Sequence, residues 1–238
     1  MNKTWSFEYQ WKNYDTKYLT YGLSEKEEFL KFCNDLKLEP NNLINKKILD
    51  AGCGSGRLTK SISRYSKKVY GVDLITLPKS KNLKFIKANI MSLPFDNSFF
   101  DIVYCEGVLH HTPDPKKAFM ELARVNKERL YIMVYSKRNI FMLFRKYFMI
   151  YKYPYSIIRL ISLIFALLSY IPINVLNYFL KYNREFTIKS LDFFIFDYLS
   201  PQYQSVHNFE EIKKWYQEAG YNTILSIEGH GIQILGIK

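Results

Sequence analysis

Two acidic residues near the start of the sequence each end a short apolar run, and three glycines lie between them. Asp50 ends the first run, Gly52, Gly54 and Gly56 follow at alternate positions, and Asp73 ends the second run. Glycine lets the backbone approach a ligand closely in a tight turn. A carboxylate after a parallel strand can accept hydrogen bonds from a ribose diol. The pattern predicts a nucleoside site at the carboxyl ends of two parallel strands.

The spacing of the glycines distinguishes between two classes of nucleoside ligand, those with and those without a pyrophosphate. Residues 52–56 follow G-x-G-x-G, whereas a pyrophosphate site uses G-x-G-x-x-G, whose third glycine packs a helix against the strand. The helix must then begin at about Gly56. This favours an amino-acid nucleoside over the nicotinamide cofactor of a dehydrogenase. Taken alone, the loop is also compatible with a plain turn after a buried strand.

The segments after the loop resemble class I S-adenosylmethionine-dependent methyltransferases of the small-molecule and quinone type. The similar segments are 85–95 with its Leu-Pro-Phe turn, 97–114, 118–125 and 209–221. The likeness covers about residues 45–136 and 197–238. It implies an α/β fold with a Rossmann-like, mostly parallel seven-stranded sheet, a closing antiparallel hairpin, and S-adenosylmethionine as the cofactor.

The resemblance assigns cofactor roles to residues at the strand ends. Asp50 would orient the loop and the amino end of the cofactor, and Asp73 would bind the ribose hydroxyls. Asn89 stands where the family usually has an aspartate that accepts a hydrogen bond from adenine, and an uncharged amide oxygen accepts more weakly. The implied cofactor residues are Asp50, Gly52, Cys53, Gly54, Gly56, Asp73, Leu74, Asn89, Ile90, Met91, Cys105 and Glu106.

Two adjacent histidines follow the predicted fourth strand. A base can assist methyl transfer to a hydroxyl, and an imidazole with a pKa near 6.5 suits that role at neutral pH. In similar O-methyltransferases a histidine at this point is a candidate base, so we predict His111, and after it His110, as catalytic. In the alternative, one histidine caps the loop and the other packs on the sheet. No metal site is predicted, because the histidines and acids lack ligand spacing.

Composition predicts one sizeable domain in a reducing compartment. The 238 residues include three cysteines without a C-x-x-C pair, and the first residues lack the apolar core of a signal peptide. We therefore expect a cytoplasmic protein. The net charge of +12 is uneven, because residues 136–189 hold nine basic side chains and one acid, Glu185. A basic excess confined to one segment indicates a local surface with a function.

The chain is expected to have four parts. Residues 1–45 form a helical cap, 46–136 the cofactor-binding α/β core, 137–206 a hydrophobic and basic helical insert, and 207–238 a helix and hairpin that complete the core. The predicted strands cover about 47–51, 68–73, 83–88, 99–105, 129–135, 222–228 and 231–237, and the predicted core helices cover 56–65, 115–126 and 208–219.

The insert is unusually apolar. Residues 160–180 carry no charge and are just long enough to span a bilayer. Pro172, Asn174, Asn177 and the return of the chain to the sheet argue against a clean span, and we predict two helices broken near Pro172. Three interpretations stay open: a buried lid over the active site, a lid that also dips into an anionic membrane surface, and a transmembrane span.

These observations favour a methyltransferase acting on oxygen or carbon of a glycan, quinone or other lipid-associated acceptor. The predicted acceptor-binding residues are Tyr9, Trp11, Tyr198, Tyr203 and His207. The predicted partner is an anionic membrane, bound peripherally at its inner face through residues 137–189. The oligomeric state is left open.

Two alternatives belong to other functional classes. An RNA methyltransferase would place basic residues around the catalytic edge, whereas here they lie in an apolar insert, so a nucleic-acid partner is disfavoured. A non-catalytic, membrane-associated protein that retains the cofactor fold is compatible with the same sequence, since fold does not dictate function.

Overall fold

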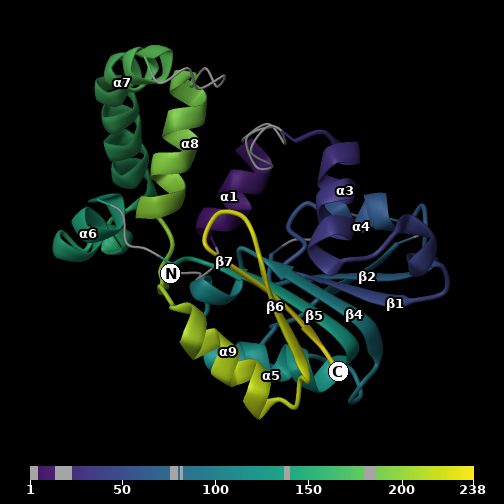
Figure 1. The fold of residues 1–238 in the computed structure, drawn as a ribbon. Coiled ribbons are helices and arrows are strands. Elements are labelled where there is room, and N and C mark those ends of the chain that lie inside the picture. Colours follow the sequence, from purple (N-terminus) through teal and green to yellow (C-terminus); the bar gives the residue numbers. More distant parts are fainter. Residues whose placement is uncertain (1–4, 14–22, 76–79, 81–82, 137–139, 180–185) are drawn as a thin grey trace. The chain divides into compact units, whose positions relative to one another are not determined.

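The computed structural model describes residues 5–13, 23–75, 80, 83–136, 140–179 and 186–238. The chain divides into two compact units. Residues 22–137 and 203–238 form what we call the sheet unit, and residues 1–21 and 138–202 form the helical unit. The elements of both units are drawn in Figure 1.

The sheet unit contains a seven-stranded sheet of order β3-β2-β1-β4-β5-β7-β6. The strands are β1 (Lys47–Ala51), β2 (Lys68–Asp73), β3 (Lys84–Lys87), β4 (Phe100–Glu106), β5 (Asn126–Val134), β6 (Thr223–Ile227) and β7 (Ile232–Ile237). Strands β1 to β5 are parallel, and β7 runs antiparallel to both of its neighbours. The predicted Rossmann-like sheet with a closing hairpin is confirmed. The strand order reverses between β1 and β4, and ligands bind at the carboxyl ends of strands at such a switch point.

Helices cover both faces of this sheet (Figure 1). The helices are α3 (Glu25–Leu36), α4 (Arg57–Ile62), α5 (Pro115–Val125) and α9 (Phe209–Glu218), with 3-10 turns η1 (Pro40–Leu43) and η2 (Leu109–His111). Helices α5 and α9 pack on one face, and α3 and α4 on the other. Alternate strand residues supply the two layers: Leu130 and Ile132 point to the first face, Tyr131 and Met133 to the second.

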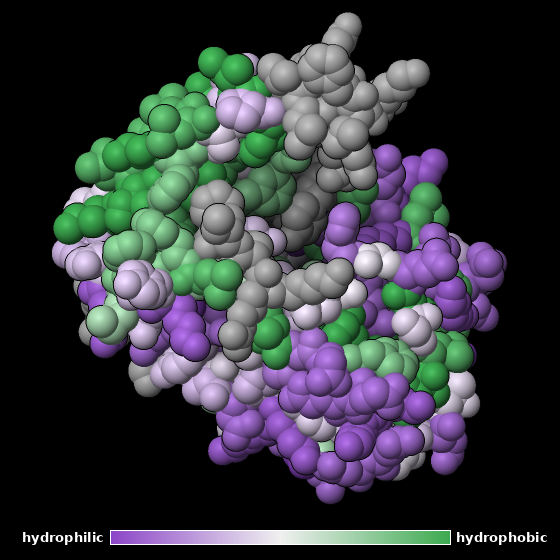
Figure 2. Space-filling model, turned by 60° about the vertical axis from the view of Figure 1, so that its left-hand side comes forward, coloured by the Kyte–Doolittle hydropathy of each residue, from purple (hydrophilic) through white to green (hydrophobic). Residues whose placement is uncertain are grey.

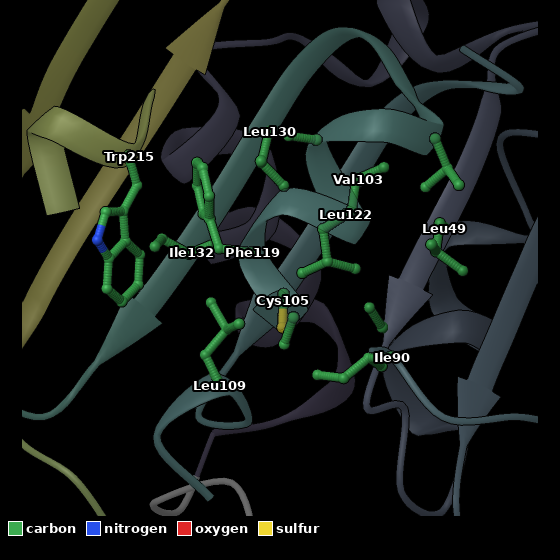
Figure 3. Close-up of a cluster of buried hydrophobic side chains, with 14 of the residues drawn as sticks. Leu49, Ile90, Val103, Cys105, Leu109, Phe119, Leu122, Leu130, Ile132 and Trp215 are labelled. Atoms are coloured by element: carbon green, nitrogen blue, oxygen red, sulfur yellow. The ribbon is translucent and has the colours of Figure 1, made fainter. Parts of the chain in front are cut away.

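The larger core cluster lies between the sheet and helices α5 and α9, as Figure 3 shows. Its labelled members, all buried, are Leu49, Ile90, Val103, Cys105, Leu109, Phe119, Leu122, Leu130, Ile132 and Trp215. The strand residues among them come from β1, β4 and β5, whose apolar runs suit central strands covered on both faces. This packing fixes the strand ends that carry the predicted cofactor residues.

The predicted helical cap of residues 1–45 is not one body. Helix α3 belongs to the sheet unit, because its fully buried Phe32 lies in the core cluster under the sheet. Helix α1 (Trp5–Asn13) belongs to the helical unit, where Gln10 Nε2 donates a hydrogen bond of 3.0 Å to Asp197 Oδ1. The boundary falls between two helices because their apolar faces have different partners.

The helical unit also contains α6 (Ile140–Tyr147), η3 (Ile150–Lys152), α7 (Tyr155–Phe179) and α8 (Ile188–Leu199). The prediction of two helices broken near Pro172 is wrong, because α7 runs through the proline. The amide of Asn174, two residues after the proline, makes two hydrogen bonds outside the helix. Its Nδ2 donates to the carbonyl of Phe186 (2.9 Å), and its Oδ1 accepts the N–H of Phe186 (3.1 Å). These bonds tie the turn after the proline to the residues that precede α8.

The outward face of α7 is apolar and exposed. Its exposed side chains are Ile157, Leu160, Leu163, Ile164, Leu167, Leu168, Tyr170 and Ile171, and Leu168 and Ile171 each expose 69% of their surface. Figure 2 shows the broad hydrophobic area to which they contribute. Among the parts of the chain that the structure describes, one stretch, Tyr155–Asn174, is long and apolar enough to cross a membrane, and only 17% of it is buried.

Candidate functional site

The glycine loop after β1 is shaped by backbone that only glycine adopts easily. Gly52, Gly54 and Gly56 have φ values of 82°, 53° and 74°. The carbonyl of Val72 on β2 accepts the N–H of Gly52 at 2.7 Å. A Cβ on Gly52 would come within 2.2 Å of a methyl carbon of Val108. The loop therefore passes through a narrow space where a side chain at this position cannot fit.

Asp73, at the end of β2, holds this loop from the side. Its Oδ2 accepts the N–H of Gly54 at 2.8 Å, and its Oδ1 accepts the N–H of Ile75 at 3.2 Å. Burial raises the pKa of Asp73, and these backbone N–H groups oppose that rise. The structure thus brings the loop and Asp73 together as the sequence predicted. Leu74 follows at the edge and is exposed.

Asp50 lies buried beneath the loop. Its Oδ2 accepts a hydrogen bond of 2.5 Å from Oγ1 of Thr59, a fully buried residue of α4. Burial raises the pKa of Asp50 from 3.8 to about 7. Thr59 was missed in the sequence, where the only signal is its position in the first turns of the helix after the loop. A nearby cation would strongly stabilise the ionised form of such a buried carboxyl group.

The turn after β3 carries the predicted adenine residues. Asn89 Oδ1 accepts the N–H of Met91 at 2.9 Å, which closes the turn. Ile90 points into the core cluster, while Met91 is half-buried. An amide oxygen has two lone pairs, so Asn89 retains capacity for one further hydrogen bond.

Cys105 and Glu106 end β4 in different surroundings. The side chain of Cys105 is fully buried in the core cluster, so it does not reach the edge of the sheet. The same burial raises the pKa of its thiol. Glu106 is partly exposed and pairs with Lys31 of α3, with 2.7 Å between Oε1 and Nζ. The hydroxyl of Tyr104 lies 2.8 Å from both Glu106 and Asp35. The sequence analysis missed this network, of which the i,i+4 pair on α3 is the one local signal.

The two adjacent histidines lie in different environments. His110 is fully buried, stacks on Tyr135 with 3.8 Å between ring centroids, and has no hydrogen-bond partner at either ring nitrogen among the described residues. Burial lowers its pKa well below the ordinary value of 6.5. The packing role of the alternative describes this environment, and a catalytic role of His110 stays a prediction. His111 is half-buried and remains the candidate base.

His111 lies beside Tyr203, one of the residues predicted to bind the acceptor. Its Nδ1 is 3.1 Å from the carbonyl oxygen of Tyr203. His207 follows in the same segment, and its Nε2 is 2.8 Å from Oγ of Ser205. No local pattern in the sequence indicates the contact between His111 and Tyr203, because the two residues are 92 positions apart.

The other predicted acceptor residues lie in the helical unit. The ring of Tyr9 packs against Tyr155 and Phe196, with centroid distances of 4.4 and 5.8 Å. Tyr198 is half-buried on α8. The side chain of Trp11 lies outside the described residues. Within the described ranges, no three His, Cys, Asp or Glu side chains form a group that could hold a metal ion.

Comparison with known proteins decides the family. A family model described as a methyltransferase domain matches residues 49–134, from β1 to the end of β5. Residues 49–134 form a class I methyltransferase domain. This domain contains the glycine loop, Asp73, the Asn89 turn and His111.

Two curated relatives share part of this domain's sequence. The uncharacterized methyltransferase YcgJ of Bacillus subtilis is 33% identical over 93 residues, which is 34% of this chain and 37% of that protein. A ubiquinone biosynthesis O-methyltransferase of Actinobacillus pleuropneumoniae is 30% identical over 95 residues, 34% of this chain and 41% of that protein. The matches thus span about two fifths of these relatives.

Solved structures share the fold of the methyltransferase domain and its flanking elements. A putative methyltransferase in complex with the Trm112 activator of Haloferax volcanii has a TM-score of 0.55 at 14% identity. That comparison covers 97% of this chain and 96% of the other. At such low identity the likeness establishes the fold and not the substrate.

Proposed function

We propose that this chain transfers a methyl group from S-adenosylmethionine to oxygen or carbon of a lipid-associated small molecule. The observation that carries the proposal is the glycine loop at the end of β1, with Asp73 bonded to it from the end of β2. S-adenosylmethionine supplies a methyl group on a positively charged sulfur. Because this group is already activated, the protein has mainly to bind, align and exclude water.

The residues of the loop fit such a donor. The positive φ values of Gly52, Gly54 and Gly56 form a tight turn, in which backbone can approach the methionine and ribose parts closely. Asp73 uses one lone pair of Oδ2 for Gly54 and keeps others for ribose hydroxyls. Asp50 offers a buried carboxyl group whose ionised form a cationic ligand would stabilise, and Asn89 offers its second lone pair to adenine.

Calorimetric titration with S-adenosylmethionine tests this proposal. We expect binding by the wild-type protein and a loss of at least about tenfold in affinity for Asp73→Ala, since one charge-assisted bond contributes about 1.5–3 kcal/mol. Asp96→Ala is the matched control, because Asp96 is an exposed aspartate in a turn of the same unit. Wild-type protein that gives no heat below millimolar donor, or an Asp73 variant that binds normally, contradicts the proposal.

The apolar face of the helical unit supports a lipid-associated acceptor. Monomeric soluble proteins rarely leave apolar patches of this extent in water. The stretch from Ile140 to Phe179 contains no aspartate or glutamate, while Lys146 and Lys152 are exposed. An apolar face with basic residues and no acids is complementary to an anionic bilayer surface. We therefore place the helical unit at the inner face of a membrane, where a lipid-borne acceptor is available.

Vesicle flotation tests the membrane part of the proposal. We expect the protein to float with phosphatidylglycerol-containing vesicles and less with pure phosphatidylcholine. Leu160→Glu combined with Leu168→Glu should abolish flotation, since both side chains are more than half exposed and the substitutions cost little folding energy. Ile44→Glu changes a side chain of similar exposure, 57%, in the sheet unit and should leave flotation unchanged. If the wild-type protein stays at the bottom of the gradient, the membrane part of the proposal is contradicted and the interpretation of the insert as a lid is left.

Transfer itself is tested with donor labelled in its methyl group and a native lipid extract. We expect label in the organic phase that depends on the protein. Donor binding without any transfer of label would instead favour the non-catalytic alternative.

A further inference from the structure

We propose that the segment Tyr203–His207 fixes the tautomer of His111, and that His207 is a positioning residue for this candidate base. The inference rests on the proposed function, because a base is useful only where an acceptor hydroxyl gives up a proton. All residues concerned belong to the sheet unit.

The geometry at His111 selects one of the two neutral tautomers. Its Nδ1 lies 3.1 Å from the carbonyl oxygen of Tyr203. A backbone carbonyl only accepts hydrogen bonds, so Nδ1 carries the proton in this contact. The lone pair of the neutral ring is then on Nε2. The carbonyl of Tyr203 thereby determines which nitrogen of His111 is basic.

Two backbone hydrogen bonds hold the segment that presents this carbonyl. The N–H of Ser205 donates to the carbonyl of His110 at 2.9 Å. The N–H of His207 donates to the carbonyl of Tyr135 at 2.9 Å. The segment is thus attached to the residues that follow β4 and those that follow β5. It forms a strap across the two strand ends nearest to His111.

The side chain of His207 stabilises the strap from within. A carboxylate accepts only, so Nδ1 of His207 donates to Oε1 of Glu211, 3.2 Å away. Nε2 of His207 lies 2.8 Å from Oγ of Ser205, in the middle of the strap. The ring is 9% exposed and meets the edge of Trp215 at a centroid distance of 5.3 Å. With both nitrogens and the ring face in contact, His207 has little freedom to move.

The chain of hydrogen bonds from Ser205 through His207 to Glu211 has the order found in hydrolytic triads. Its surroundings give it a different role. The N–H of Ser205, a donor that could otherwise stabilise an oxyanion at this serine, is already donated to the carbonyl of His110. These hydrogen bonds therefore hold the backbone of the Tyr203–His207 segment in place. Their effect is transmitted to His111 through the carbonyl of Tyr203.

Nitrogen NMR of the four histidines tests the inference in the full-length protein without donor or acceptor. In protein labelled with 15N at histidine and held at pH 8, we expect His111 to show a protonated Nδ1 and an unprotonated Nε2, assigned by His111→Gln. His207→Ala should convert this single tautomer into a mixture, and Glu211→Gln should shift it in the same direction. His230→Gln is the matched control, because His230 is exposed between β6 and β7 and should leave His111 unchanged.

Two results would overturn the inference: a wild-type His111 protonated at Nε2, or folded His207 and Glu211 variants in which its tautomer is unaltered. His207→Gln replaces the alanine variant if the latter does not fold. The measurement is independent of donor binding, so its failure leaves the Asp73 titration intact. Failure of that titration likewise leaves the tautomer of His111 as measured.

Discussion

The two units of this chain differ in how completely they cover their own apolar surface. Of the eighteen large hydrophobic side chains exposed among the described residues, thirteen lie in the helical unit, between Leu143 and Ile171. The sheet unit buries its apolar residues between a sheet and two helical layers, and leaves polar groups at the strand ends. The sheet unit thus covers most of its own apolar surface, whereas the helical unit leaves an apolar face exposed.

The largest expected effect concerns the loop on which the chemistry of the sheet unit depends. Gly52→Ala adds a Cβ within 2.2 Å of Val108 at a φ of +82°. Either the loop or Val108 must move by about 1 Å, and misplacing reacting groups by that distance costs on the order of 100-fold in rate. We expect the rate of methyl transfer to fall by this factor and donor affinity, measured by calorimetry, to fall as well.

Gly220→Ala is the control for that substitution. It has a similar φ of +79°, but no atom lies within 4 Å of the added Cβ. It should lower stability by about 1 kcal/mol and leave donor binding unchanged. Equal losses of affinity in the two variants would mean that backbone strain, and not the narrow space at the loop, limits binding.

A medium effect is expected from the buried carboxyl of Asp50. Its pKa is raised to about 7 in the folded protein, so the folded state holds this proton more tightly than the unfolded chain. The free energy of unfolding therefore falls as the pH rises from about 4 to 7. Relative to Asp50→Asn, the wild-type protein should lose on the order of 2 kcal/mol between pH 5 and pH 7.

Urea unfolding of both proteins at the two pH values measures this difference. Asp96→Asn, which changes an exposed carboxyl, should show the pH dependence of the wild type. A constant difference between wild type and Asp50→Asn would show that Asp50 stays ionised throughout, and that the sheet unit tolerates a buried charge without a cation.

The smallest effect concerns the helical unit. Because α7 continues through Pro172, Pro172→Ala restores a backbone N–H inside a helix. Since the alanine also gives the unfolded chain more freedom, the free energy of unfolding should rise by only about 1 kcal/mol. Pro154→Ala, just before α7, should change it little, since the first residues of a helix lack N–H partners in any case. Circular dichroism during urea unfolding measures both. A Pro172→Ala variant with a lower free energy of unfolding would contradict this prediction, because it would mean that the proline stabilises the helical unit.

The strands of the sheet unit were predictable because their signals are local. β1, β2 and β7 follow the predicted ranges closely, since each is an apolar run bounded by glycine or charged residues. β5 begins at Asn126, three residues earlier than predicted, because the polar stretch before its apolar run also pairs with β4. The start of α3 also has a local signal, the capping box of Ser24 and Glu27.

Contacts between distant residues were not predictable from a single sequence. No pattern around His111 indicates that the carbonyl of Tyr203 lies beside it, and none around Asp50 indicates its bond to Thr59. The hydrogen bonds of Asn174 to Phe186, 12 positions later, are likewise not indicated by any local pattern. The same limitation explains why His110 and His111, adjacent in sequence, could not be distinguished before their burial was known.

The position of β7 between β5 and β6 has a consequence for biosynthesis. In the pairing of β5 with β7, Arg129 lies opposite Ile237. A ribosome therefore makes β5 roughly a hundred residues before it makes β7. The apolar helices α7 and α8 are synthesised during that interval, while the edge of β5 that will pair with β7 has no partner strand. An open strand edge and bare apolar helices are both prone to aggregation. During synthesis, both surfaces are therefore uncovered until β7 has been made and pairs with β5.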